Sequence, residues 1–177
     1  MTADLTIVTK PLAATSFFFA YDEPEDRLVL LATDSENRSL ALGLTRRLTG
    51  RLINALCVVL EKSSINASTA PADLRDDIIL LEHQGALSVH STPAPCPRPP
   101  VPGGPRGLLT NVEITTLPDG FGLTFRDARQ PKIQFKINRV GLHRMLEVIA
   151  RHAEAANWHI AIESSWLEPG QKHIVLN

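Results

Sequence analysis

The hydrophobic period changes part-way along Leu40-Ala-Leu-Gly-Leu-Thr-Arg-Arg-Leu-Thr-Gly-Arg-Leu-Ile-Asn-Ala-Leu56. Leu40, Leu42 and Leu44 alternate with smaller residues, which is typical of a strand with one buried face. The apolar residues then recur at helical spacing, at Leu48, Leu52, Ala55, Leu56 and Val59. Thr45 stands at the change, where its side chain can accept an early helical N–H. The stretch predicts a strand that leads directly into an amphipathic helix.

The same pattern returns in the second half of the chain, at an offset of 93 residues that places Asn138 opposite Thr45. Residues 19–61 align with residues 112–154 without a gap. The apolar positions pair in order, among them Leu28 with Phe121, Leu30 with Leu123, Leu42 with Phe135 and Leu52 with Met145. Six pairs are identical: Asp26/Asp119, Leu30/Leu123, Asp34/Asp127, Arg46/Arg139, Arg51/Arg144 and Glu61/Glu154. We interpret this agreement as an internal duplication.

Each half reads as three strands joined by polar turns, followed by one amphipathic helix. The predicted fold class is therefore α+β, with a duplicated β-β-β-α unit whose antiparallel meanders are each followed by a helix. A three-stranded sheet with a single helix has a thin core and leaves one sheet face bare. We expect the two halves to complete one core in a pseudo-twofold arrangement.

The domain organisation follows from the repeat and from one interruption. Residues 1–90 form the first half, with an extra helix at 71–84 that carries Leu74, Ile78 and Leu81 on one face, and then a short strand at 87–89. Residues 91–107 form a linker, because seven of the chain's 13 prolines fall there. Within it, Pro97-Arg-Pro-Pro100 fits a PxxP ligand pattern, although a plain linker is favoured. Residues 108–177 form the second half, ending in strands at 159–163 and 173–176.

Composition narrows the class of protein. The chain has 177 residues, 44% of them hydrophobic and 21% charged, with a net charge of -1. This near-neutral balance gives no reason to expect nucleic acid as a partner. The apolar runs are far shorter than the ~20 residues of a membrane span, and the first residues lack the features of a signal peptide. With only two cysteines, no disulfide scaffold is indicated. We expect a cytoplasmic protein without a membrane partner.

No catalytic or cofactor motif stands out in the sequence. The six histidines form no HxH or HExxH ligand pair, so no metal is expected and the histidines are interpreted as surface or helix-end residues. No glycine-rich phosphate loop occurs, and no other cofactor is implied. Cys57 lies within an apolar helical pattern and is predicted to be a core residue, whereas Cys96 lies in the linker. The sequence therefore points to no particular reaction.

The candidate site residues are basic side chains at the starts of the two predicted helices: Arg46, Arg47, Arg51, Arg139 and Arg144. Cations are disfavoured there by the helix dipole, by about 0.3–1 kcal/mol each. One explanation is a pair of sites for a small anion or for a partner's acidic group. The other is structural, with Asp26 bridging to Arg46 and Asp119 to Arg139. We favour the bridge at Arg46 and Arg139, which leaves Arg47 and Arg51 for an outside partner.

The ten residues Leu40-Ala-Leu-Gly-Leu-Thr-Arg-Arg-Leu-Thr49 resemble a motif of a small uncharacterised bacterial protein family, in which a strand runs into Leu-Thr-Arg-Arg-Leu. Gly43 stands where that pattern has a tryptophan. The resemblance implies a bacterial origin and carries no activity with it.

Three functional hypotheses remain open at this point. The leading one is a non-enzymatic accessory or binding protein that acts through contacts with a protein partner or with itself. The alternative is a module that binds a small anion or a nucleotide phosphate through its arginines. The third is an enzyme whose residues are scattered along the chain without a local motif.

Overall fold

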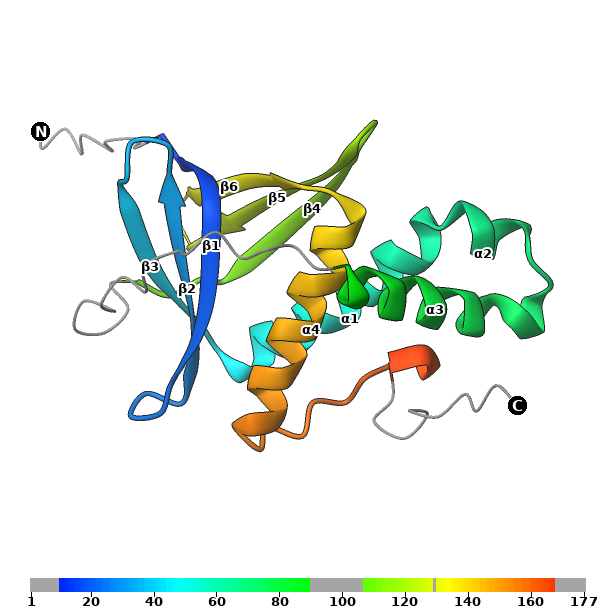
Figure 1. Ribbon diagram of the computed structural model, residues 1–177. Coiled ribbons are helices and arrows are strands. Elements are labelled where there is room, and N and C mark those ends of the chain that lie inside the picture. Colours follow the sequence, from blue (N-terminus) through cyan, green and yellow to red (C-terminus); the bar gives the residue numbers. More distant parts are fainter. Residues whose placement is uncertain (1–9, 90–106, 129, 168–177) are drawn as a thin grey trace, which may run out of the picture.

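The computed structural model describes residues 10–89, 107–128 and 130–167. These residues include six strands and four α-helices (Figure 1). The first group of elements is β1 (Leu12–Asp22), β2 (Arg27–Asp34), β3 (Ser39–Leu44) and α1 (Arg46–Ser63). Next come α2 (Ile65–Thr69), a 3₁₀ turn η1 (Ala72–Leu74) and α3 (Arg75–Ser88). The last group is β4 (Asn111–Leu117), β5 (Gly120–Arg126), β6 (Pro131–Ile137), α4 (Arg139–Ala155) and the 3₁₀ turn η2 (Ser165–Leu167). The predicted α+β class is confirmed.

The strands form one mixed sheet in the order β3-β2-β1-β6-β5-β4. Neighbours within each group of three are antiparallel, so both meanders form as predicted. The two meanders join through a short parallel pairing of β1 with β6, at Leu12 with Ile133 and Ala13 with Gln134. At the edge strand β3, the N–H of Gly43 donates to the carbonyl of Gly107 (2.9 Å), and the carbonyl of Gly43 accepts from the N–H of Leu109 (2.8 Å). The segment that precedes β4 therefore links the two outer strands.

The second and third strands of each meander pair in corresponding registers. Leu28 lies opposite Leu44 in the first meander, and Phe121 lies opposite Ile137 in the second. The first strands do not follow the ungapped alignment, because the β1–β2 loop is two residues longer than the β4–β5 loop. Phe19 pairs with Leu30 in the first meander, and Ile114 pairs with the corresponding residue Leu123 in the second. Phe19 therefore corresponds to Ile114, and the predicted pairing of Phe19 with Val112 is wrong.

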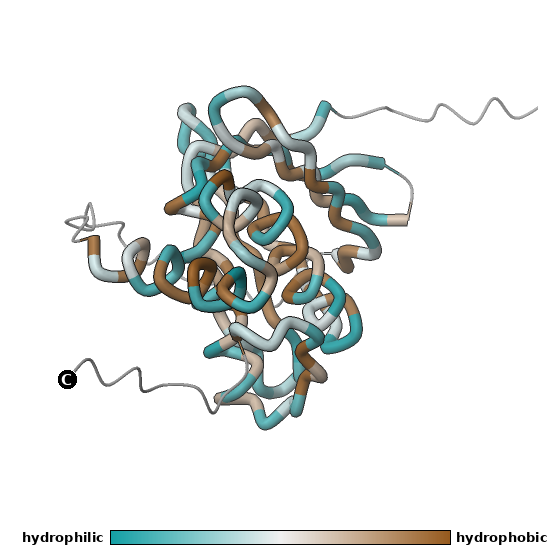
Figure 2. Tube along the Cα trace, turned by 90° about the vertical axis from the view of Figure 1, so that its right-hand side faces the viewer, coloured by the Kyte–Doolittle hydropathy of each residue, from teal (hydrophilic) through white to brown (hydrophobic). Residues whose placement is uncertain are grey.

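Helices α1 and α4 pack on each other and against the sheet, and their apolar faces supply much of the core. Figure 2 shows apolar and polar residues interspersed along the chain. Buried residues alternate with less buried ones along β5, as expected for a strand with one face in the core, whereas β2 is buried on both faces. Cys57 is fully buried, as predicted, and burial raises the pKa of its thiol to about 12. The largest buried side chains include Phe19, Leu28, Leu30, Leu44, Ile53, Leu56, Leu60, Phe125 and Trp166.

The helix expected at 71–84 differs from the one observed. A 3₁₀ turn occupies Ala72–Leu74, and α3 continues through Gly85 to Ser88, so no strand forms at 87–89. The apolar face expected to be buried is largely exposed, with Leu74 at 46% and Leu81 at 55% relative exposure. The buried face instead consists of Ile79, His83 and Ala86. The cause is the composition of α3, whose apolar residues lie on several sides and define no single face.

The strand expected at 159–163 is also absent, and the expected strand at 173–176 lies outside the described residues. After α4 the chain runs back along α1 in an irregular conformation (Figure 1). Asn54 of α1 hydrogen-bonds to the backbone of this segment. Its side-chain amide donates to Ala161 O (3.0 Å) and accepts from Glu163 N (3.0 Å). The approach is close at Gly50, where a Cβ would lie 3.3 Å from Ile160 Cγ2. Side-chain bonds replace a sheet partner for this segment.

The described residues contain no helix that is long and apolar enough to cross a membrane. The proline-rich segment, with Cys96 and the PxxP pattern, lies outside the described residues except for Gly107.

Both predicted helix caps form, and their removal should weaken both helices by similar amounts. Thr45 Oγ1 accepts from Leu48 N at 3.2 Å, and Asn138 Oδ1 accepts from Gly141 N at 2.8 Å. We expect Thr45→Ala and Asn138→Ala each to lower the free energy of unfolding by about 1 kcal/mol, measured by urea denaturation. Thr45→Ser and Asn138→Asp keep the acceptor and should stay close to wild type. Equal losses in the alanine and the conservative variants would contradict this account.

Candidate functional site

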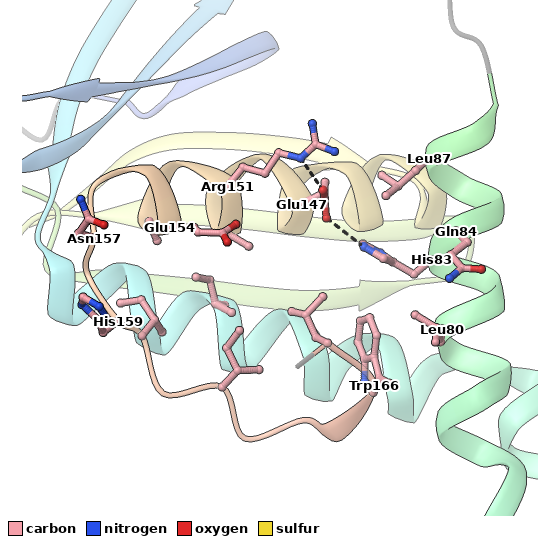
Figure 3. A pocket seen from close by; sticks show the side chains of 16 residues that line it. Leu80, His83, Gln84, Leu87, Glu147, Arg151, Glu154, Asn157, His159 and Trp166 are labelled. Atoms are coloured by element: carbon pink, nitrogen blue, oxygen red, sulfur yellow. Dashed lines mark hydrogen bonds and ion pairs between the residues drawn. The ribbon is translucent and has the colours of Figure 1, made fainter. Parts of the chain in front are cut away.

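A pocket of about 660 Å³ lies between α3, α4, α1 and the segment that follows α4 (Figure 3). Helix α3 contributes Leu80, His83, Gln84 and Leu87 to one wall. Helix α4 contributes Glu147, Ala150, Arg151, Ala153 and Glu154. Residue Ile53 of α1 and the C-terminal residues Asn157, His159, Ile160, Ile162, Trp166 and Leu167 complete the lining. The volume is in the range of small-ligand and peptide-anchor sites.

The lining combines an apolar interior with polar groups from α4 and the C-terminal segment. Leu87 is 36% exposed in this wall. Arg151 donates to Glu147 Oε1 at 2.5 Å, so these two charges compensate each other. The Glu154 side chain has no ion-pair partner among the described residues. The pocket therefore offers apolar contact and one uncompensated negative charge.

A pair of buried histidines lies at the α3 end of the pocket. His83 of α3 and His143 of α4 are 4% and 1% exposed, and their Nδ1 atoms lie 3.2 Å apart. The other ring nitrogen of His83, Nε2, lies 3.3 Å from Glu147 Oε2. Trp166 packs edge-on against both rings, with centroid distances of 5.5 Å to His83 and 6.5 Å to His143. Two helices and the C-terminal segment thus meet at this pair.

The proton positions follow from the partners. The carboxylate of Glu147 only accepts, so His83 donates its Nε2–H to it, and this bond lowers the pKa of Glu147 to about 2. Between the two Nδ1 atoms, one ring donates and the other accepts. His143 Nε2 is buried without a hydrogen-bond partner. Burial, together with the positive charges of His83 and Arg139, lowers the pKa of His143 to about 4.

Both nitrogens of His83 are used inside the protein, so the one histidine that is buried in the pocket wall presents no free base to a bound molecule. Among the described residues there is also no cluster of three or more His, Cys, Asp or Glu side chains able to hold a metal ion.

Two of the five candidate arginines make contacts inside the protein. Arg139 donates to Glu82 Oε2 (2.5 Å) of α3, and also to Ser63 Oγ (2.6 Å) and Leu60 O (2.9 Å) of α1. This pair and the bonds from Ser64 and Asn66 lower the pKa of Glu82, against the opposing effect of its burial. Arg144 donates to the carbonyls of Ala86 and Val89 at the end of α3. Both arginines therefore hold α3 against the body of the protein.

The other three candidates, Arg46, Arg47 and Arg51, are exposed at the start of α1. They line a shallow hollow of about 590 Å³ with Gly50, Asn54, His159, Ile160, Ala161 and Glu163. No carboxylate lies within 4 Å of their guanidinium groups among the described residues.

The expected bridges do not form. Asp26 instead accepts from Tyr21 OH (2.7 Å) and Trp158 Nε1 (2.6 Å), and these bonds hold its pKa below the ordinary value, with a smaller effect of Arg46. The β1–β2 turn is thereby fixed to the end of α4. Arg139 pairs with Glu82 rather than with Asp119.

The histidine pair was missed because its members are 60 positions apart in the sequence and come from different helices. One local signal was present. His143 lies between the predicted core residues Leu142 and Met145, four positions before Glu147, and therefore on an inward-facing part of α4. The interpretation of the histidines as surface or helix-end residues is wrong for His83 and His143.

No family model, curated protein or solved structure matches the chain. The resemblance of residues 40–49 to an uncharacterised bacterial family stays a hypothesis.

The first residues of α1 and α4 provide a matched test of the structural role of the arginines. We expect Arg139→Ala to lower the free energy of unfolding by about 1–3 kcal/mol, because it leaves the half-buried Glu82 carboxylate without its cation. Arg46→Ala removes an exposed side chain at the corresponding position and should change stability by less than about 0.5 kcal/mol. Both are measured by urea denaturation at pH 7.5. Equal effects of the two substitutions would contradict this assignment.

Proposed function

We propose that this chain is a non-enzymatic binding protein that takes an apolar segment of a protein partner into the pocket between α3 and α4. The observation that carries the proposal is the lining of that pocket. Apolar side chains from three helices and the C-terminal segment converge there, and Leu87 is left partly exposed. Binding of a short segment in a groove between helices is a common mode of protein recognition.

The charges that line the pocket indicate which side chains a partner segment should carry. Arg151 is already paired with Glu147, and Glu154 on the same wall has no ion-pair partner among the described residues (Figure 3). A partner segment with a Lys or Arg close to its apolar residues would compensate Glu154. We therefore favour an apolar segment that carries one basic side chain, and a second copy of this chain is the competing occupant.

The duplication is part of the same proposal. It is supported by the equal registers of the β2–β3 and β5–β6 hairpins and by the caps Thr45 and Asn138, which each bind the third N–H of their helix. Each meander also contributes one parallel contact to the other, through β1 with β6 and through the segment before β4 with β3. We interpret the two units as copies in a pseudo-twofold arrangement that have since diverged.

The pocket can be tested with a displayed library of random peptides of about 12 residues. We expect the full chain at pH 7.5 to select peptides that combine large apolar residues with a Lys or Arg. Leu87→Glu should weaken their binding at least about tenfold, because it places a charge in the apolar wall. The measurement is peptide affinity by fluorescence polarisation.

Leu81 provides the matched control for this experiment. It lies on the same helix and is 55% exposed, but it does not line the pocket, so Leu81→Glu should leave the affinity unchanged. Glu154→Lys should change the selected peptides from basic to acidic. Peptides that bind wild type and Leu87→Glu equally, or an absence of selected peptides together with dimer formation, would contradict the proposal.

A second candidate function is binding of a small anion at the start of α1. It is favoured by the three exposed arginines, which lie in one hollow without a carboxylate within 4 Å among the described residues. The positive end of the helix dipole at the start of α1 would add to the attraction of an anion. The ligand in this case would be a phosphate or carboxylate group.

Inorganic phosphate tests the second candidate directly. At ten times its dissociation constant, phosphate should stabilise the wild type by about 1.4 kcal/mol, measured as a rise of the melting temperature. Arg47→Ala and Arg51→Ala should abolish the rise, whereas Arg126→Ala, which removes an exposed cation from β5, should not. A rise that survives both substitutions at the start of α1 would exclude this site.

A further inference from the structure

We propose that His83 and His143 form an acid-sensitive clasp that holds α3 against α4 and so keeps the α3 wall of the pocket in place. This inference concerns the regulation of the pocket and rests on the proposed function for its biological meaning. Its physical basis is independent of any partner, because it depends only on the contact between the two rings.

The contact between the rings accommodates one proton and not two. The Nδ1 atoms lie 3.2 Å apart, so one must donate and the other must accept. If both rings carry a proton on every nitrogen, two N–H groups face each other and the bond is lost. Two positive charges are then also buried at close range, which is strongly unfavourable. Full protonation of the pair therefore requires the rings to separate.

The surroundings offer little compensation for a second positive charge. On α4, Arg139 and Arg144 are cations, and Glu147 is already bound by His83 and Arg151. On α3, Glu82 is committed to Arg139, Ser64 and Asn66. On α1, Glu61 already accepts from Trp166 and Ser164. No described group stands within hydrogen-bond distance of His143 Nε2.

Separation of the rings moves α3, because His83 is one of only three buried residues of that helix. The same helix supplies Leu80, Gln84 and Leu87 to the pocket (Figure 3). Displacement of α3 therefore removes one wall of the pocket. In this way a proton taken up at a buried site would control the shape of the pocket.

The expected size of the effect follows from the pKa of His143, which is about 4 when docked and 6.5 ordinarily. The released ring takes up a proton more readily, so the docked state loses stability as the pH falls from about 6.5 to about 4 and keeps it above 6.5. Between pH 7 and pH 5 the population of the released state should rise about 20-fold.

The test is hydrogen exchange of the α3 amides in the full chain without a partner, corrected for intrinsic exchange rates. In wild type, exchange in α3 should rise about 20-fold between pH 7 and pH 5, whereas the β2 amides should not change. His143→Leu removes the titrating ring and should abolish the rise. His152→Gln, on the same helix but outside the pair, should behave like wild type. A rise that persists in His143→Leu, or no rise in wild type, would overturn the clasp.

A second measurement keeps the proposal testable if His143→Leu fails to fold. Proton NMR of wild type follows each of the six histidines through its titration. The His143 signal should titrate only below pH 5. A His143 signal that titrates near 6.5 in the docked protein would overturn the clasp.

The outcomes separate the clasp from the proposed function. Peptide binding at pH 7.5 with unchanged α3 exchange at pH 5 would leave the binding function standing and exclude the clasp. Acid-dependent exchange of α3 without peptide binding would establish the clasp and exclude the proposed use of the pocket.

Discussion

The packing of α1 on α4 is the contact on which the rest of this structure depends. Each three-stranded meander carries an apolar face that one helix cannot cover alone. Because the two helices lie side by side under one continuous sheet, each buries the exposed flank of the other. The parallel pairing of β1 with β6 involves only two residue pairs and could not hold two separate units together. Burial of the shared helical faces therefore makes one core out of two thin ones.

Helix α3, which forms one wall of the pocket, is attached to the body of the protein in a different way. Only Ile79 and Ala86 are apolar among its buried residues. Its position depends on polar contacts that are specific in geometry: Glu82 with Arg139, the carbonyls of Ala86 and Val89 with Arg144, and His83 with His143. A helix held by few apolar contacts is a natural candidate for local movement.

The sequence was sufficient wherever one periodicity and one burial pattern agreed. It predicted both meanders, the helices α1 and α4, their caps and the burial of Cys57. It failed for α3, since apolar residues on several sides of a helix do not show which side is covered. It failed for the C-terminal segment, because the backbone of that segment hydrogen-bonds to the side chain of Asn54 instead of to a neighbouring strand. It could not find the histidine pair or the pocket, because both depend on how α3 docks.

The two helix starts show how similar positions acquire different roles. Arg46 and Arg139 occupy the first position of α1 and of α4. Only the second faces α3, where Glu82 is partly buried and needs a cation. The start of α1 instead lies beside the irregular segment at 159–163. The backbone of that segment hydrogen-bonds to Asn54 rather than to an arginine. The arginines of α1 are exposed, whereas those of α4 make contacts inside the protein. It is the neighbour of each helix, rather than its own sequence, that decides which arginines are used in packing.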